Sequence, residues 1–215
     1  PFSDGLELNF SCPHAKGYGQ VIGQDKELVS KIISVITTKT NIPIFAKLSP
    51  NIPNLGEIAK ACANSGAYGI TAINTAGPGY HMVDGHPVLT NKLGGLSGKA
   101  ILPIGLKCIK EISEAISSLE KETKIIACGG ITSAQDIKNY EAAGADFFGI
   151  GSALTGMDTQ ELKLYFSALE KDLQNSTNHA ASFLKPNTSM GYTKYQIHKK
   201  TNLAEDLTLL EFNDS

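Results

Sequence analysis

One short segment of the chain places a cysteine where its thiol could take up and return a proton. Residues 7–14 read ELNFSCPH, a short strand that ends at Asn9 and delivers Cys12 to the loop above it. A free thiol has a pKa of about 8.5, and a nearby cation or aligned amides bring it toward neutrality, so Cys12 is a candidate general base. A lone cysteine after a strand is more often a small buried hydrophobic residue. The case for Cys12 therefore depends on its neighbours and on the other strand ends.

Two other apolar segments end in polar side chains. Lys47 stands near the end of the segment FAKLSP, where a cation needs an anion or water. Asn74 and Thr75 follow the strand-like AIN and offer amide and hydroxyl groups that can bind a heterocycle or a carboxylate. Taken alone, Lys47 is also compatible with a side chain reaching out to solvent, and Asn74-Thr75 with an ordinary turn.

Glycine pairs follow two further strand-like segments. Residues 128–131 read CGGI, residues 149–152 read GIGS, and a third glycine-rich stretch, GGLSG, ends at Gly98. Glycine lets bare backbone N–H groups approach an anion closely, and loops of this kind commonly bind a phosphate dianion. The candidate phosphate-binding residues are Gly98, Gly129, Gly130, Gly151 and Ser152.

The elements that must position these residues alternate along the chain. Five segments that are apolar, often β-branched and bounded by turn residues predict strands, at Leu6–Phe10, Ile42–Leu48, Tyr68–Asn74, Lys124–Cys128 and Asp146–Ile150. Amphipathic patterns between and after them predict helices, at Asp25–Thr40, Asn54–Ser65, Ala100–Lys121, Ser133–Ala143 and Thr159–Gln174. Asp25 is the expected N-cap of the first helix, and Leu28, Val29, Ile32, Ile33 and Ile36 form its apolar stripe.

Alternating strands and helices predict an α/β fold with a parallel sheet. An open doubly wound sheet and a (β/α)8 barrel both satisfy this pattern. Chemistry-bearing residues follow nearly every strand, which favours the barrel, because an open sheet concentrates its ligand at one switch point. The chain would then hold about the last five of eight βα units, as an incomplete TIM barrel over residues 1–174, and the other three would lie upstream of Pro1.

The motif around Cys12 resembles the Asn-x-Ser-Cys-Pro motif of class 1 dihydroorotate dehydrogenases and of the pyrimidine-reducing domain of dihydropyrimidine dehydrogenase. The resemblance extends from about Leu6 to Gln174. It implies an FMN-dependent enzyme in which Cys12 removes the C5 proton of the dihydropyrimidine while hydride leaves C6 for the flavin. The membrane-linked class 2 enzymes carry serine at this position, so Cys12 points away from them. His14 stands where many class 1 enzymes have asparagine, and it is not assigned a catalytic role.

The same resemblance assigns the other candidates. It places Lys47 beside the N1/O2 edge of the flavin, where a cation would stabilise the anionic reduced form, and Ile73 against the flavin. It assigns Asn74 and Thr75 to the substrate and Asn9 to both ligands. The glycines named above, with Ser152, would hold the FMN phosphate.

Within this family, the first interpretation is a class 1B-type catalytic chain of pyrimidine (UMP) biosynthesis. It would oxidise dihydroorotate to orotate and pass electrons to a separate or fused FAD and iron–sulfur reductase and then to NAD, within a homodimer or heterotetramer. The alternative is a dihydropyrimidine dehydrogenase type that reduces uracil or thymine with NADPH. A barrel that only binds a flavin or phosphate would have no need of Cys12, Lys47 and Asn74 together.

Composition and charge limit the other classes of function that the chain could have. With 215 residues, 41% hydrophobic residues and a formal charge of −2, the chain is not expected to bind nucleic acid or an anionic membrane. No apolar stretch approaches the roughly 18 residues of a membrane span. The four widely spaced cysteines predict no disulfide scaffold and fit a reducing, cytoplasmic setting. His81 and His86 lack a third ligand at suitable spacing, so no metal site is predicted, and they are read as flanking a hairpin turn at Asp84-Gly85.

The character of the sequence changes after Gln174. Residues 175–215 begin with a polar linker, and Tyr192 to Phe212 alternates loosely like strands. Two interpretations remain open. This part is either the opening hairpin of a ferredoxin-reductase-like β module or a C-terminal extension packed on the barrel.

Overall fold

The computed structural model describes residues 3–11, 22–175, 196–204 and 207–213. Contacts divide the chain into two compact units, residues 1–181 and 182–215. The larger unit is built on a five-stranded sheet whose strands are β1 (Leu6–Asn9), β2 (Ile44–Leu48), β3 (Gly69–Ala72), β8 (Lys124–Cys128) and β9 (Phe147–Gly149). Every neighbouring pair is parallel, and the spatial order β1-β2-β3-β8-β9 is also the order along the chain.

Five α-helices accompany these strands. They are α1 (Lys26–Thr37), α2 (Leu55–Asn64), α3 (Leu102–Ile116), α4 (Ala134–Ala142) and α5 (Thr159–Gln174), with short 3-10 turns at Ile22–Gln24, Lys99–Ile101 and Ser152–Leu154. All five predicted strands and all five predicted helices are confirmed, most of them a few residues shorter than predicted. The predicted helix Ala100–Lys121 is the least accurate. It begins as a 3-10 turn before Pro103 and ends at Ile116, where the Ser117 hydroxyl bonds back to the Glu114 carbonyl oxygen.

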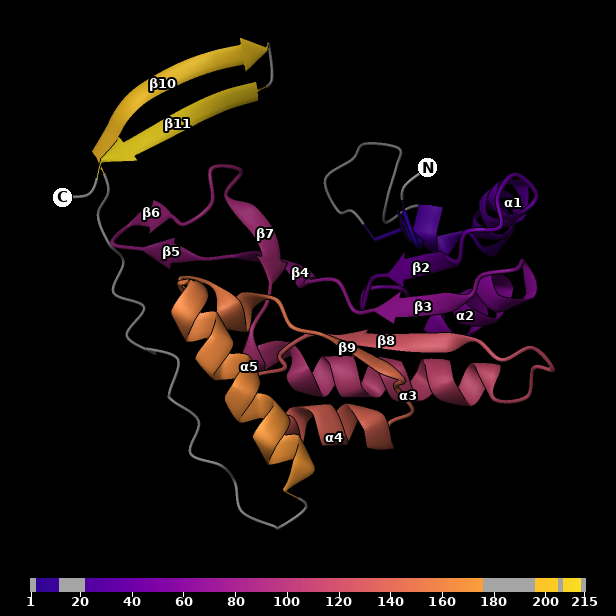
Figure 1. Ribbon diagram of the computed structural model, residues 1–215. Coiled ribbons are helices and arrows are strands. Elements are labelled where there is room, and N and C mark those ends of the chain that lie inside the picture. Colours follow the sequence, from indigo (N-terminus) through magenta and orange to yellow (C-terminus); the bar gives the residue numbers. More distant parts are fainter. Residues whose placement is uncertain (1–2, 12–21, 176–195, 205–206, 214–215) are drawn as a thin grey trace. The chain divides into compact units, whose positions relative to one another are not determined.

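The strand order distinguishes between the two sheet types that the sequence left open. Right-handed crossovers that always advance in one direction put every helix on the same face, whereas a doubly wound sheet reverses direction at its switch point. Side-chain burial agrees, because Ile44, Ala46 and Leu48 of β2 are buried while Phe45 and Lys47 are half-buried. Figure 1 shows α3 and α4 running along one side of the sheet. The architecture is therefore of the TIM-barrel type.

The core lies between the sheet and its helices. Its largest fully buried side chains include Tyr140, Ile33, Ile44, Leu48, Leu55, Ile70, Ile109 and Ile112. The apolar stripe predicted for α1 is confirmed at Val29 and Ile33, which are fully buried, but Leu28 is exposed. A helix that packs one narrow stripe against a sheet leaves the edge of its apolar face in solvent.

The predicted N-cap of α1 is confirmed, and glycines follow the ends of two other helices. The Asp25 carboxylate caps α1 by accepting hydrogen bonds from the backbone N–H groups of Glu27 and Leu28, both at 3.0 Å. Gly66 and Gly144 follow α2 and α4 with φ of 104° and 106°, the left-handed conformation that turns the chain into the next strand.

A long connection between β3 and α3 forms two antiparallel pairs. The predicted hairpin is confirmed as β5 (Met82–Val83) and β6 (His86–Pro87), and its turn residues Asp84 and Gly85 have φ of 51° and 79°. The pairing of β4 (Ala76–Tyr80) with β7 (Leu93–Leu96) was not predicted. The sequence AGPGY of β4 contains two glycines and a proline and reads as a loop.

The smaller unit contains one antiparallel hairpin. Strand β10 (Gln196–Ala204) pairs with β11 (Leu207–Asn213), so the strand character predicted for this stretch is confirmed. Its relation to a reductase module stays a prediction. Among the described residues, no helix is both long and apolar enough to cross a membrane.

Candidate functional site

A chain of hydrogen bonds joins the ends of β1 and β3. Asn9 Oδ1 accepts from both the backbone N–H (3.0 Å) and the hydroxyl (2.7 Å) of Ser11. The Ser11 Oγ in turn accepts from the Asn74 side-chain amide at 2.7 Å. Asn74 Oδ1 accepts from the Thr75 backbone N–H at 2.8 Å, and so fixes which way this amide points. Three predicted site residues are thus brought together, and Ser11, which the sequence analysis did not single out, connects them.

The orientation of these amides leaves polar groups available to a ligand. Within the described part of the chain, the Asn9 Nδ2 group donates no hydrogen bond. The Thr75 side chain packs on Gly95, where an added Cβ would lie only 1.8 Å from its Oγ1. Gly95 therefore lets β7 approach the end of β3.

Lys47 lies on the face of the sheet opposite the helices, which we call the open face and which carries Glu7, Asn9, Phe45, Lys47, Thr71, Ile126 and Cys128. Its Nζ forms an ion pair with Glu7 Oε1 at 3.5 Å, and 28% of its side chain is exposed. The Thr71 hydroxyl donates to Glu7 Oε2 at 2.7 Å. The cation predicted at this position therefore has a carboxylate partner that the sequence analysis missed, because Glu7 was read as part of the strand.

The predicted phosphate-binding loops converge at the ends of β7, β8 and β9. Gly98, Gly129 and Gly130 have φ of 81°, 121° and 73°. A Cβ added to Gly130 would lie 2.8 Å from the Leu102 backbone nitrogen and 3.0 Å from the Gly98 carbonyl oxygen, and one added to Gly98 would lie 3.7 Å from Ser152 Oγ. Among the described residues, the backbone N–H groups of Gly130 and Ser152 donate no hydrogen bond. We call the loop segments of Gly98, Gly129, Gly130, Gly151 and Ser152 the glycine cradle.

Ile73 connects the cradle to the rest of the site. Its side chain is buried, and its backbone N–H donates to the Cys128 carbonyl oxygen at 3.0 Å. A Cβ added to Gly129 would lie 3.0 Å from Ile73 Cγ1. The end of β3 therefore packs directly on the glycine pair that follows β8.

A buried carboxylate anchors the loop that leaves the cradle for α4. Asp136 accepts hydrogen bonds from the Thr132 backbone N–H (2.9 Å) and hydroxyl (3.0 Å), and Lys99 pairs with its other oxygen. Burial opposes ionisation, but the bonds from Lys99, Thr132 and Ser133 outweigh it and hold the pKa of Asp136 below its ordinary value. This network ties the loop before α3 to the start of α4.

Replacing Asp136 with asparagine is expected to destabilise the fold by about 1.5–3 kcal/mol at neutral pH, the usual value of hydrogen bonds to a charged group. Because the folded-state pKa is lowered, the stabilisation is present above the unfolded-state pKa and is lost as pH falls through the folded-state value. The difference between natural and variant proteins should therefore shrink below about pH 4. Urea unfolding at several pH values measures this, with Asp84→Asn, in an exposed turn that suits asparagine, as the control. An equal difference at all pH values would contradict the ionic role.

Tyr140 supports the cradle from below. Its side chain is fully buried, its hydroxyl donates to the Gly129 carbonyl oxygen at 2.7 Å, and it fills space that Gly105 leaves free, since a Cβ there would lie 1.8 Å from the hydroxyl oxygen. The phenol thus holds one wall of the cradle in place.

Tyr140→Phe is expected to cost about 1–2 kcal/mol of stability, because the Gly129 carbonyl loses its buried donor. It should also weaken the affinity of the cradle for its ligand, by loosening Gly129. The matched control is Tyr165→Phe, which removes a longer bond, 3.2 Å, to the Thr132 carbonyl oxygen outside the cradle. Urea unfolding and ligand titration separate the two effects. Equal ligand affinity in both variants would show that Tyr140 does not shape the cradle.

Cys12 and His14 lie outside the described residues. The three described thiols, Cys62, Cys108 and Cys128, are free cysteines. Burial raises the pKa of Cys62 to about 12 and raises the pKa of Cys108 and Cys128 above its ordinary value. For Cys128, Lys47 lowers the pKa only in part and Glu7 raises it. None of the three is therefore activated as a base.

Other polar groups lie apart from the site. A groove of about 750 Å³ on the outer side of α3 and α4 is lined by Lys107, Glu111 and Asn139, among others, and does not include the strand ends. Within the described part of the chain, no group of three or more His, Cys, Asp and Glu side chains is placed to hold a metal ion.

Parallel strands in sequential order, with polar side chains at their carboxyl ends and a glycine cradle after the last two strands, define an α/β protein of the TIM-barrel type. The chain matches the dihydroorotate dehydrogenase family model over residues 1–174, and it belongs to that family. This confirms the family that the motif at Cys12 predicted. A relation to dihydropyrimidine dehydrogenase is not shown.

Similar curated proteins agree with this family assignment. The chain is 42% identical over 151 residues to the dihydroorotate dehydrogenase B (NAD(+)) catalytic subunit of Oceanobacillus iheyensis, covering 70% of this chain and 48% of that protein. It is 44% identical over 155 residues to the subunit of the same name from Archaeoglobus fulgidus, covering 72% and 50%. The chain thus spans about half the length of the curated relatives it matches.

Solved structures support the fold. The ligand-free DHODH of Eimeria tenella superposes with a TM-score of 0.62 at 20% identity, covering 80% of this chain and 50% of that one. The same enzyme in complex with ferulenol gives a TM-score of 0.59 at 21% identity, covering 71% and 45%. At this level of identity, the likeness shows the fold alone.

Proposed function

We propose that this chain forms much of the active site of an NAD-linked dihydroorotate dehydrogenase, which oxidises dihydroorotate to orotate in pyrimidine biosynthesis. The observation that carries the proposal is the hydrogen-bonded group of Asn9, Ser11 and Asn74, of which Asn9 and Ser11 lie just before Cys12 in the sequence. It supplies amide groups for a pyrimidine ring, and Cys12, the next residue in the sequence after Ser11, carries a thiol that can act as a base.

FMN fits the residues that are present. A Cβ would collide with backbone atoms at Gly130, and the N–H groups of Gly130 and Ser152, which donate no hydrogen bond among the described residues, suit a phosphate dianion. Gly98, Gly129, Gly130, Gly151 and Ser152 would hold that phosphate, while Ile73 and Lys47 would contact the flavin. When bound, the flavin supplies a two-electron acceptor for the hydride that leaves C6 of the substrate.

The residues of the chain would do the rest of the chemistry. Asn9, Asn74 and Thr75 would hold the pyrimidine, and Cys12 would remove the proton from C5. A base needs a pKa near the working pH, which the described thiols lack because burial raises theirs. Removal of the C5 proton is therefore assigned to the Cys12 thiolate.

We further propose that the five βα units are about the last five of a (β/α)8 barrel. The sequential parallel sheet supports this, as does the cradle after β8 and β9, which corresponds to the usual phosphate site after strands 7 and 8. Residues 1–174 would form this partial barrel, and residues 175–215 would be a linker and C-terminal extension, with β10 and β11 as the opening hairpin of a reductase-like module.

The relatives are named catalytic subunits of an NAD(+) enzyme. By analogy, we propose a partner subunit or fused module that carries FAD and an iron–sulfur centre, within a homodimer or heterotetramer. The three free described cysteines fit a reducing, cytoplasmic setting.

The test is anaerobic flavin absorbance of the natural protein that carries this chain, mixed with dihydroorotate in one cuvette and with NADPH in another. Rapid bleaching by dihydroorotate is expected. Bleaching by NADPH alone, with reoxidation by uracil, would instead identify a dihydropyrimidine dehydrogenase. Absence of a bound flavin would refute both.

A further inference from the structure

Glu7 lies on the open face of the sheet, which would become the inside of the proposed barrel, and 41% of its side chain is exposed in the described structure. Such interiors are filled mainly by branched apolar side chains, and a carboxylate among them is stable only with partners. Glu7 has two, the Lys47 ammonium at 3.5 Å and the Thr71 hydroxyl at 2.7 Å. Both partners come from other strands, so this cluster is part of the tertiary structure rather than a local turn.

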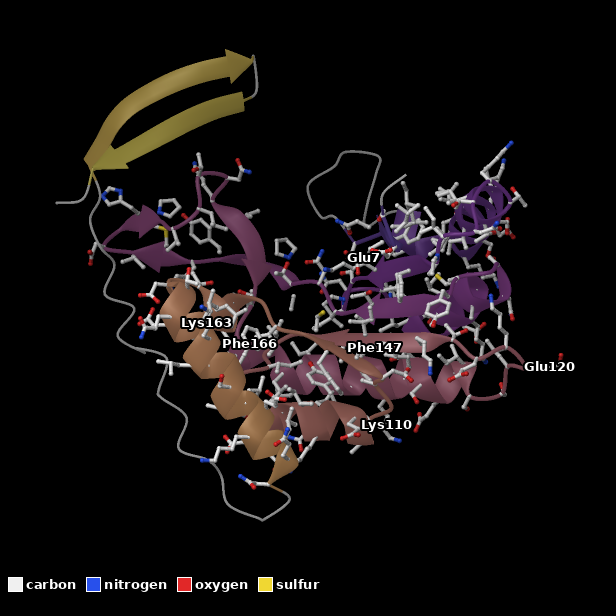
Figure 2. All side chains as sticks on the ribbon, viewed as in Figure 1. Glu7, Lys110, Glu120, Phe147, Lys163 and Phe166 are labelled. Atoms are coloured by element: carbon white, nitrogen blue, oxygen red, sulfur yellow. The ribbon has the colours of Figure 1, made fainter. Side chains whose placement is uncertain are left out.

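The register places the two charges at different depths. Asn9 pairs with Lys47, and Lys47 pairs with Thr71, so these three form one row across the sheet. Glu7 precedes Asn9 by two residues and pairs with Phe45, one row further from the strand ends. Figure 2 labels Glu7 on the side of the sheet away from α3 and α4. The carboxylate therefore lies beneath the lysine as seen from the site.

The two partners hold Glu7 with different strength. The bond from Thr71 is short and fixes one oxygen, whereas the contact to Lys47 is long for an ion pair. The ammonium can thus shift toward another anion while the carboxylate stays in place. The two charges also act on a neighbouring strand. Burial is the largest influence on the pKa of Cys128 on β8 and raises it, while Lys47 lowers this pKa and Glu7 raises it.

We propose that Glu7 is a positioning residue that offsets the charge of Lys47 and so sets how strongly the site favours the reduced, anionic flavin. The inference rests on the proposed function. Lys47 alone would place an uncompensated cation beside the flavin, and the carboxylate beneath it reduces that field. Glu7 would act through Lys47, which it contacts, rather than by touching the flavin or the substrate itself.

The experiment is the flavin midpoint potential of the natural protein and of Glu7→Gln, measured anaerobically by dye equilibration. Removing the carboxylate charge should make the potential more positive, and the ratio of affinities for reduced and oxidised flavin should rise by roughly tenfold, the effect expected of one nearby charge in a protein site. Lys47→Met should shift the potential in the opposite direction.

Two controls separate charge from structure. Thr71→Val removes the hydrogen bond to Glu7 and lowers stability, but it keeps both charges and should leave the potential nearly unchanged. Asp146→Asn removes a carboxylate paired with Lys124 at 3.1 Å at the opposite edge of the same sheet, and it should also leave the potential unchanged. Should Glu7→Gln fail to fold, Glu7→Met removes the same charge with a side chain that suits an apolar interior, and the same positive shift is expected.

A Glu7 variant that binds flavin with an unchanged or more negative potential would overturn the inference, because Glu7 would then only hold strands together. This outcome differs from failure of the proposed function. In that case the natural protein itself would hold no flavin or would not be bleached by dihydroorotate, whatever residue stands at position 7.

Discussion

Cys12→Ala is expected to keep its flavin and to lose flavin reduction by dihydroorotate by about 10²–10⁴-fold, the usual contribution of a general base. Flavin binding should persist because the cradle residues follow β7, β8 and β9, far along the chain from Cys12. The loss should be specific to the proton step, because Ser11 would still connect Asn9 with Asn74. Stopped-flow absorbance under anaerobic conditions measures the rate.

Cys128→Ala is the matched control for this variant. Cys128 is a second thiol on the open face at the end of β8, and the same change removes the same atoms. Because burial raises the pKa of its thiol, we expect it to stay protonated and its loss to leave the rate of flavin reduction within a few fold. If the Cys128 variant were the slow one, the base would have been assigned to the wrong strand.

The sequence predicted the elements well for a physical reason. Most strands of the main sheet are short apolar runs, and several helices carry an apolar stripe with a capping residue at one end. Local signals therefore agree with the tertiary structure at Asp25, Gly66 and Gly144. The β4–β7 pair was missed because its stability does not come from its own residues. Gly77 and Gly79 disfavour strand conformation, and β4 is a strand because it pairs with β7.

The candidate site also contains residues that the sequence could predict and residues that it could not. Asn9, Lys47, Asn74 and the cradle residues after β8 and β9 could be predicted, because each follows or ends a recognisable strand, and Gly98 could be predicted from the glycine-rich stretch GGLSG. The supporting residues could not, since their roles depend on partners distant in the sequence. Ser11 is hydrogen-bonded to Asn74, which is 63 positions away in the sequence, and Glu7 is hydrogen-bonded to Thr71, which is 64 positions away. A buried serine or a strand glutamate carries no local signal of such a partner.

Gly130→Ala is expected to weaken flavin affinity by roughly a hundredfold. Gly130 has φ of 73°, where a Cβ costs about 1–2 kcal/mol. The same Cβ would lie 2.8 Å from the Leu102 nitrogen and 3.0 Å from the Gly98 carbonyl oxygen, which are backbone atoms that can move only by opening the cradle. Overpacking of this kind costs about 1–3 kcal/mol, and each 1.4 kcal/mol is about tenfold in affinity. Flavin retained per polypeptide after gel filtration, and titration of the apoprotein, measure the loss.

Gly5→Ala provides the comparison at the opposite edge of the sheet. Gly5 precedes β1, its φ is not left-handed, and an added Cβ would lie 3.5 Å from the Phe45 ring, an ordinary contact. This variant should bind flavin like the natural protein. If Gly130→Ala instead kept full affinity, the backbone at Gly98 and Leu102 would have to yield without cost to the ligand. The phosphate would then have to be held mainly elsewhere, and the cradle after β8 would be a packing feature rather than a binding site.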